Sequence, residues 1–158
     1  MPDKIPMTPR GQQRLKDELA KYKAERPIIV KAIEVARGHG DLSENADYDA
    51  AKERQGWIEG RIKQIEGMLS NAQVIDPSEL DAEGKVVFGS TVELEDEHTG
   101  EALKYQIVGE DEADLKLGLI NVSSPIARAL IGKEEGDTAE VQAPGGVKRY
   151  EIVGVSYL

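Results

Sequence analysis

The chain has 158 residues, with 20 Lys and Arg against 30 Asp and Glu, and it carries a formal net charge of −10 at pH 7. It contains no cysteine and only two histidines, which excludes a disulfide framework, a thiolate zinc site and a histidine-rich metal site. No apolar run is long enough to span a bilayer and the first residues lack a signal-peptide core, so we expect a cytoplasmic protein.

The charge is divided unevenly along the chain. Residues 1–76 hold 13 basic and 13 acidic side chains, whereas residues 77–158 hold 7 basic and 17 acidic ones. The second half therefore carries the whole net charge and is poorly suited to neutralising nucleic-acid phosphates. An acidic surface of this kind suits a basic protein partner, or it serves solubility alone.

A first long helix is predicted from Thr8 to Arg37. Thr8 and Pro9 are typical of an N-cap followed by a first helical proline. Apolar and small residues then repeat in steps of three, four and seven, as on the buried face of a coiled coil, with Arg26 in the one missing position. Pro27 should kink this helix or restart it. The seam consists of Leu15, Leu19, Tyr22, Ile29, Ile33 and Ala36.

A second helix follows, with a seam of similar length in unbroken steps of three and four. Two such seams joined by a short turn predict an antiparallel coiled-coil hairpin, a rod of about 45 Å at 1.5 Å per residue. Near the turn the seam consists of Ala36, Tyr48 and Ala51, and small side chains there let the two helices approach closely. A rod with a thin polar end suits a protein that enters a narrow channel better than a purely structural rod. The second seam consists of Tyr48, Ala51, Gln55, Ile58, Ile62, Ile65, Leu69 and Ala72.

The turn between the helices, at residues 38–46, carries two carboxylates, Asp41 and Glu44. Gly38 and Gly40 suit the end of the first helix, because glycine adopts the left-handed backbone values of a C-terminal cap. Two interpretations stay open. Asp41 and Glu44 form a capping box at the start of the second helix, or both point off the end of the rod into a partner's active site. Further candidate caps are Ser43 and Asn45.

After Asp76 and Pro77 the pattern changes to short β-like runs separated by turns. One short helix is predicted, capped by Ser124 and ended by Gly132. An antiparallel sheet packed on that helix makes the chain an α+β protein. The acidic run 110–114 lacks the spacing of a calcium loop and predicts a solvated turn. The β-like runs are residues 85–88, 90–94, 103–108, 119–122, 139–141 and 150–155.

Five blocks stand out in order along the chain: Thr8–Gly11, Gly38–Tyr48, Leu69–Asp76, Val87–Ser90 and Ser124–Gly132. Together they resemble the bacterial Gre transcript-cleavage factors, and most closely the GreA branch of that family. The resemblance implies a coiled-coil hairpin, residues 1–76 with its tip at 38–46, that enters the secondary channel of a backtracked bacterial RNA polymerase. It also implies a C-terminal domain of FKBP-like fold, residues 77–158, that docks on the outside of that channel.

The resemblance implies the chemistry as well. RNA polymerase holds one Mg²⁺ with its own aspartates, and in-line hydrolysis of a phosphodiester is helped by a second metal about 4 Å away. Asp41 and Glu44 are implied to hold that second Mg²⁺ jointly with the polymerase, which then cuts its own RNA and escapes arrest. The protein itself is then no enzyme, binds no metal tightly when isolated, and is expected to be a monomer.

Two further sets of residues take roles from the resemblance. Arg37 and Lys52, close to the tip, are implied to contact the 3′ end of the nascent RNA, and Arg54 is a weaker candidate. The alternative for all three is a solvated helix surface with i,i+4 ion pairs. The predicted surface for docking on the polymerase consists of Ser124, Pro125, Ile126 and Arg128.

Two other functions stay open. A protein of the same fold could occupy the channel and inhibit the polymerase without cleavage, although inhibitory relatives tend to have altered, more acidic tips. An FKBP-like domain also suggests a peptidyl-prolyl isomerase, but fold analogy is a weak warrant for activity. That activity needs an aromatic-lined pocket, for which residues 77–158 offer only Phe88, Tyr105, Tyr150 and Tyr157.

Overall fold

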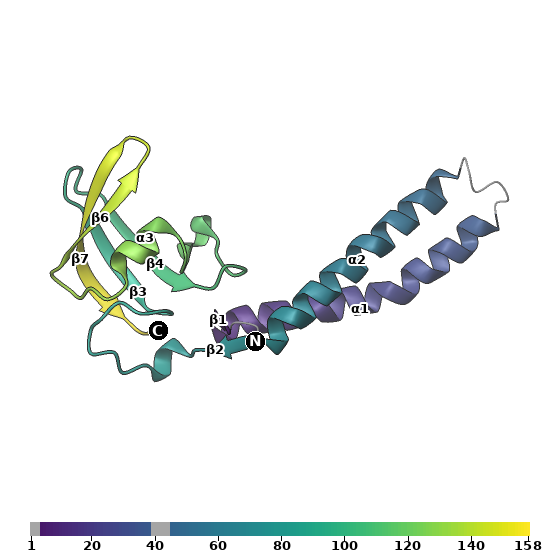
Figure 1. The fold of residues 1–158 in the computed structure, drawn as a ribbon, viewed down its shortest axis with the longest axis horizontal. Coiled ribbons are helices and arrows are strands. Elements are labelled where there is room, and N and C mark those ends of the chain that lie inside the picture. Colours follow the sequence, from purple (N-terminus) through teal and green to yellow (C-terminus); the bar gives the residue numbers. More distant parts are fainter. Residues whose placement is uncertain (1–3, 39–44) are drawn as a thin grey trace. The chain divides into compact units, whose positions relative to one another are not determined.

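The computed structural model describes residues 4–38 and 45–158 (Figure 1). Among these residues no helix is long and apolar enough to cross a bilayer. The helices are α1 (Pro9–Arg37), α2 (Ala46–Ser70) and α3 (Pro125–Leu130), and the short 3₁₀ turns are η2 (Pro77–Glu79) and η3 (Leu115–Leu117). The strands are β1 (Ile5–Met7), β2 (Ala72–Val74), β3 (Thr91–Asp96), β4 (Ala102–Val108), β5 (Leu119–Asn121), β6 (Thr138–Ala143) and β7 (Gly146–Ser156).

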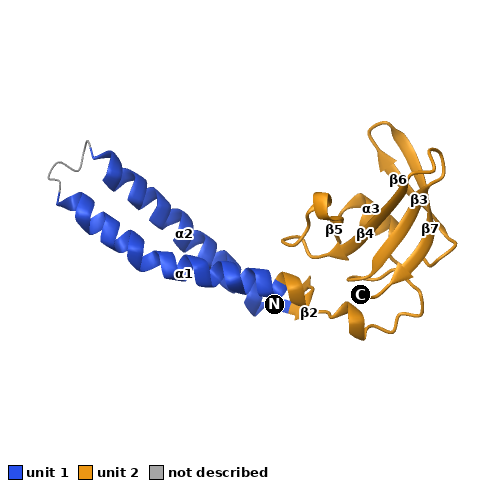
Figure 2. Cartoon of the chain, turned by 180° about the vertical axis from the view of Figure 1, so that it is seen from behind, with its two compact units in different colours: residues 1–3, 12–72 blue, residues 4–11, 73–158 orange. Residues whose placement is uncertain are grey.

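The described chain packs as two compact units (Figure 2). The first lies within residues 12–72 and holds almost all of α1 and α2. The second combines residues 73–158 with residues 4–11, so that β1 and the first turn of α1 pack with the C-terminal half. The predicted domains, 1–76 and 77–158, differ from these units only at residues 4–11 and 73–76, which belong to the second unit. The separate functions of the two domains stay a prediction.

The hairpin of α1 and α2 is held together by the predicted seam. Apolar side chains in steps of three and four lie on one face of each helix and are buried against the other helix. Removing such side chains from water pairs the helices, and a fully buried isoleucine contributes about 1.5–3 kcal/mol. The predicted helical hairpin is thereby confirmed. Its buried seam residues are Leu15, Tyr22, Ile29, Ile33 and Ala36 on α1, and Ile58, Ile62 and Ile65 on α2.

Details at the middle and the end of the hairpin differ from the prediction. Of the two outcomes predicted at Pro27, a kink or a restart, the restart does not occur: α1 is one continuous helix, because a single proline removes only one N–H hydrogen bond from a helix whose neighbouring turns stay intact. α2 ends at Ser70, so Ala72 belongs to β2 rather than to the seam. β1 and β2 pair as a small sheet that was not predicted, because three-residue strands carry too little pattern to be seen.

Three arginines of the described helices cross-link the surface of the hairpin. Each guanidinium makes two N–H···O contacts of 2.6–3.1 Å with a glutamate of the other helix. These hydrogen bonds hold the pKa of each glutamate below its usual value. Exposed ion pairs contribute little individually, but paired contacts of this geometry help to set the register of the helices. The pairs are Arg26–Glu59, Arg54–Glu25 and Arg61–Glu18.

The C-terminal sheet has five strands in the order β5-β4-β3-β7-β6. Neighbouring strands run antiparallel, except that β4 and β5 are parallel. A register shift between Glu93 and Leu94 marks a β-bulge in the β3–β7 pair. The α+β class with one short helix packed on a sheet is confirmed, and the sheet is mixed rather than purely antiparallel.

Two parts of this sheet differ from the prediction for non-local reasons. β5 lies parallel to β4 because the chain returns through η3 and Gly118, whose φ is +75°. A Cβ at Gly118 would lie only 2.9 Å from the carbonyl oxygen of Lys104, so this return requires glycine. The predicted strand at residues 85–88 is not formed: Lys85 makes only an isolated β-bridge to Glu134. Val86 in the same run is nevertheless fully buried in the core.

α3 packs on the sheet and completes the core of the second unit (Figure 1). Ser124 is the N-cap of α3, and its Oγ accepts the N–H of Ala127 at 3.3 Å. Pro125 takes the first helical position, where a missing N–H costs nothing. The fully buried core side chains include Val92, Leu94, Ile107, Leu130 and Ile152.

Candidate functional site at the hairpin tip

The predicted carboxylates Asp41 and Glu44 lie outside the described residues, and their roles as catalytic residues and Mg²⁺ ligands stay a prediction. The structure does describe both sides of the tip. Gly38 follows α1, and Asn45 precedes α2. The contacts of these flanking residues show how the two helices end and begin on either side of the tip.

Asn45 is the N-cap of α2. Its backbone is extended, with φ −90° and ψ 97°, and its Oδ1 accepts the N–H of Tyr48 at 3.0 Å. Asparagine is among the best N-caps, because its side-chain oxygen satisfies an N–H that has no partner within the helix. Asp47 and Asp49 follow in the first turn, where negative charge is favoured by the helix dipole.

The same side chain of Asn45 joins the two helices. Its Nδ2 donates to the carbonyl oxygen of Ala36, in the last turn of α1, at 2.6 Å. Ala36 is 1 % exposed and Asn45 is 9 % exposed, so this bond is removed from water. At the same end of α1, the N–H of Gly38 donates to the carbonyl oxygens of Glu34 and Val35 at 3.2 and 3.1 Å.

The cap at Asn45 decides one part of the question left open by the sequence. A capping box led by Asp41 would start a helix at residue 42 and place Glu44 at its third position. α2 begins instead at Ala46, after its own cap. The N-cap of α2 is therefore Asn45, and the interpretation of Asp41 and Glu44 as metal ligands stays a prediction.

The predicted basic residues near the tip fall into two groups. Arg37 and Lys52 are exposed and form no ion pair with any described residue, although the Nζ of Lys52 lies 3.4 Å from the Oε1 of Gln55. Arg54 is bound through two N–H groups to Glu25 on α1. This engagement agrees with the weaker candidacy of Arg54 for RNA contact.

Trp57 lies beside Arg54 on the outer face of the hairpin. Its ring stands edge-on to Tyr22, with centroids 5.3 Å apart, and the Arg54 guanidinium lies 4.8 Å from its centroid. The indole is still 51 % exposed, so it is both a packing and a surface residue. Because the chain has one tryptophan, its fluorescence reports on the hairpin alone.

The four predicted docking residues lie together at the start of α3. Ser124 caps the helix and Ile126 packs against the core, so both have structural tasks. Pro125 and Arg128 are exposed. The solvent-facing part of the predicted surface is therefore Pro125 and Arg128, and its contact with a polymerase stays a prediction.

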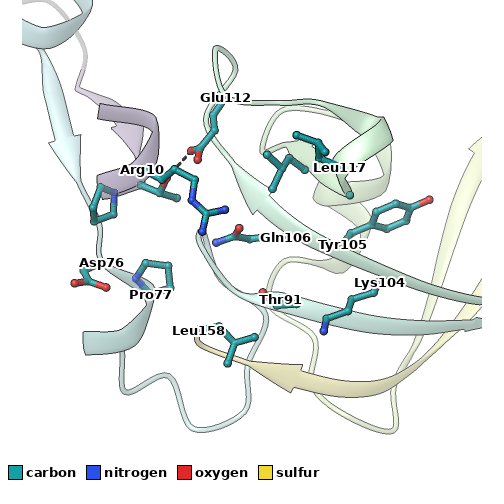
Figure 3. A pocket seen from close by; sticks show the side chains of 14 residues that line it. Arg10, Asp76, Pro77, Thr91, Lys104, Tyr105, Gln106, Glu112, Leu117 and Leu158 are labelled. Carbon is teal, nitrogen blue, oxygen red and sulfur yellow. Dashed lines mark hydrogen bonds between the residues drawn. The ribbon is translucent and has the colours of Figure 1, made fainter. Parts of the chain in front are cut away.

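The acidic run 110–114 contains a turn in which Glu110 and Asp111 are exposed as predicted, but Glu112 is an exception. It is only 4 % exposed, and its carboxylate accepts a hydrogen bond from the hydroxyl of Thr8, the residue before α1 (Figure 3). The Thr8 hydroxyl oxygen also accepts the N–H of Gly11 at 3.1 Å. The sequence offered no signal for this contact, because its partners are 104 residues apart.

A cleft of about 510 Å³ lies next to this contact in the second unit (Figure 3). Among the described residues that line it, only Tyr105 is aromatic. Four of the lining side chains are charged: Arg10, Asp76, Lys104 and Glu112. A prolyl-isomerase pocket needs several aromatic walls, so this cleft does not support that alternative.

A metal site complete in itself is not found in the part of the chain that the structure describes. No three or more His, Cys, Asp or Glu side chains lie close enough together there to hold a metal ion. The two tip carboxylates, outside that part, offer hard oxygen donors of the kind that Mg²⁺ takes, but they fill only a fraction of its octahedral shell. A Mg²⁺ site at the tip therefore requires ligands from a partner and from water.

Comparisons with known proteins cover both units. The family model for the N-terminal part of transcription elongation factors matches residues 5–74, and the model for the C-terminal part of GreA/GreB transcription elongation factors matches residues 81–157. Transcription elongation factor GreA of Verminephrobacter eiseniae is 71 % identical over 154 residues, which cover 97 % of this chain and 98 % of that protein. GreA of Polaromonas naphthalenivorans is 64 % identical over 155 residues, 98 % of each chain.

Among solved structures, GreA/GreB from Nitrosomonas europaea is 26 % identical and covers 99 % of this chain and 100 % of that one, with a TM-score of 0.43. The two sequence relatives and the two family models extend over nearly the whole length, and they agree with each other. The chain belongs to the GreA/GreB family of transcription elongation factors.

Proposed function

We propose that this chain stimulates the cleavage of backtracked nascent RNA by bacterial RNA polymerase and so returns arrested complexes to synthesis. The observation that carries the proposal is the match to both halves of the family, at residues 5–74 and 81–157. The hairpin enters the secondary channel of the polymerase in the cytoplasm, and the tip reaches the active site. The chain itself is not an enzyme, because the bond is cut by the polymerase.

The chemistry rests on Asp41 and Glu44. Asp41 and Glu44 would hold a Mg²⁺ jointly with the polymerase, as two negative oxygen ligands of the kind that this ion prefers. When bound, the ion would supply the positive charge that activates the attacking water. The cap at Asn45 supports this role, because α2 needs neither carboxylate for its own start. With so few ligands of its own, the isolated chain holds Mg²⁺ weakly.

The two predicted parts have different tasks in this proposal. Residues 1–76 carry the tip to the reaction, and residues 77–158 dock on the outside of the channel through the surface at Ser124, Pro125, Ile126 and Arg128. The exposure of Pro125 and Arg128 supports that surface. The acidic charge of the C-terminal half also suits a basic protein partner. One copy of the chain suffices for both tasks, so the protein acts as a monomer.

The test is RNA cleavage by a purified, backtracked elongation complex with and without this chain. The expected result is a shortened RNA whose new 3′ end can be extended, formed at a rate that rises with chain concentration and then saturates. Slower elongation without cleavage would identify a channel-occupying inhibitor instead. No effect on the complex, together with accelerated isomerisation of a prolyl peptide, would favour the isomerase.

Arg128→Ala should raise the concentration of chain needed for half-maximal cleavage by roughly tenfold, while the maximal rate stays unchanged. An exposed arginine at the centre of an interface commonly contributes this much, and Arg128 is far in sequence from the reacting groups. The measurement is a titration of cleavage rate against chain concentration. The matched control is Lys148→Ala, which removes an exposed cation of β7 outside the proposed surface. Equal half-maximal concentrations for both variants would remove Arg128 from the docking surface.

Replacing both Arg37 and Lys52 with alanine should lower the maximal cleavage rate by roughly tenfold at low salt and by less at high salt. Attraction between these side chains and RNA phosphates is screened by added ions. The rate is measured at saturating chain over a range of salt concentrations. Lys31→Ala is the control, because Lys31 is exposed on α1 but is paired with Glu34 at 3.8 Å. A double variant with the unmodified rate at every salt concentration would assign Arg37 and Lys52 to a solvated helix surface.

A further inference from the structure

We infer that Asn45 is a positioning residue for RNA cleavage, because its side chain fastens the end of α1 to the start of α2 and so sets the two ends between which Asp41 and Glu44 are held. The inference rests on the proposed function, since Asn45 acts through these two carboxylates. It concerns the described contacts of Asn45 and requires no contact between Asn45 and the metal.

The contact with Ala36 is the first line of support. The last four carbonyl groups of a helix have no partner within it and usually turn to water. The carbonyl of Ala36 is instead satisfied by the amide of Asn45 at 2.6 Å, in a place where both residues are buried. A donor removed from this site would leave a buried acceptor unsatisfied, so the bond resists opening.

The choice of residue is the second line of support. An N-cap needs only an acceptor, and serine, aspartate and asparagine cap helices about equally well. The asparagine amide places its acceptor and its donor on two separate atoms, Oδ1 for the N–H of Tyr48 and Nδ2 for the carbonyl of Ala36. Ionised aspartate offers no donor, and serine carries both functions on a single, shorter hydroxyl. The requirement for a cap therefore does not explain asparagine at position 45, whereas the link between the helices does.

The consequence for the reaction follows from geometry. Ligands for a shared metal have to be held within about 0.5 Å of their working positions. The segment that carries Asp41 and Glu44 runs between Gly38, bonded to the last turn of α1, and Asn45, bonded to both helices. Loss of the link to Ala36 lets these two ends move apart, and a small misplacement of this kind can cost two orders of magnitude in rate.

The experiment uses substitutions that keep the cap and remove the link. Asn45→Asp and Asn45→Ser both retain an acceptor for the Tyr48 N–H and both remove the Nδ2 that donates to Ala36. Aspartate has no donor and adds a charge, whereas serine adds no charge and replaces two separately placed atoms with one short hydroxyl. Asn71→Ser is the matched control, because the Asn71 amide donates to the carbonyl of Gly67 at 3.0 Å at the opposite end of α2. Asp41→Asn is measured alongside them to test the proposed function itself.

Four quantities are measured for each full-length variant: the maximal cleavage rate in a backtracked complex, the half-saturating concentration, the thermal midpoint from Trp57 fluorescence, and the hydrogen exchange of the Gly38 amide in the free protein. Both Asn45 variants should lower the maximal rate by roughly ten- to a hundredfold, at a temperature well below their midpoints and with an unchanged half-saturating concentration. Exchange at Gly38 should accelerate roughly tenfold. Asn71→Ser should leave the rate and the Gly38 exchange unchanged.

The other outcomes overturn the inference in distinguishable ways. If both Asn45 variants melt earlier but cleave at the unmodified rate, Asn45 is structural only. If Asn45→Asp alone loses activity while the Gly38 exchange stays unchanged in both Asn45 variants, the added charge is the cause and the link is irrelevant. If Asp41→Asn cleaves at the unmodified rate, the proposed mechanism fails and the inference fails with it. If Asp41→Asn is inactive and both Asn45 variants are fully active, the mechanism stands and only the role of Asn45 is rejected.

Discussion

Asp41→Asn and Glu44→Gln should each bind the polymerase normally and yet lower the maximal rate of stimulated cleavage by roughly a hundredfold or more. Both substitutions keep the size of the side chain and remove the negative charge that a Mg²⁺ ligand needs. Stability should change by no more than a few tenths of a kcal/mol, because asparagine and glutamine replace these residues well at helix starts and α2 has its own cap in Asn45. The measurement is the cleavage rate at saturating chain across a Mg²⁺ titration.

Added Mg²⁺ should recover part of the lost rate, since a weakened site is filled by mass action. A thermal melt by Trp57 fluorescence and competition with the unmodified chain for polymerase serve as checks on folding and binding. Asp49→Asn is the matched control: it removes one exposed carboxylate from the first turn of α2, just beyond the tip, and should change the rate little. A well-folded Asp41→Asn chain that cleaves at the unmodified rate would contradict the mechanism proposed for the tip.

The second large effect is expected in the seam of the hairpin. Ile62→Ala should destabilise the first unit by about 2–5 kcal/mol, because Ile62 is 1 % exposed and its loss leaves a cavity between two helices. For a unit of this size the thermal midpoint should fall by at least about 8 °C. The measurement is a melt followed by the fluorescence of Trp57, which lies on α2 five residues away.

Lys63→Ala is the control for this substitution, because it truncates the neighbouring residue on the exposed face of α2 and should change stability by less than about 0.5 kcal/mol. Hydrogen exchange of core amides such as that of Ile152 reports on the second unit in the same sample. If the two units are stable independently, Ile62→Ala should leave that exchange unchanged. Equal midpoints for Ile62→Ala and Lys63→Ala would show that the seam does not hold the hairpin together.

The sequence by itself determined the two long helices, their seams and the family. A repeat of apolar residues in steps of three and four specifies both a helix and its buried face, because the period of the side chains is a local property of the backbone. The start of α1 after Thr8 and of α3 after Ser124 followed from cap chemistry for the same reason. The roles of Asp41 and Glu44 came from the family resemblance and remain to be tested, since the pattern Asp-x-x-Glu is compatible with a cap and with a metal ligand.

Only the tertiary structure decided the contacts between residues that are distant in sequence. It placed Arg26 against Glu59, which explains a charged residue in an apolar seam, and it buried Glu112 against Thr8 in a run that looks solvated. It also brought β5 parallel to β4 and joined Asn45 to Ala36. Each of these contacts depends on where the packed chain brings two segments together. The conformational preferences of a short sequence cannot specify such long-range contacts. The same side chain can cap a helix, lie on the surface or form a buried hydrogen bond, depending on which residues pack against it.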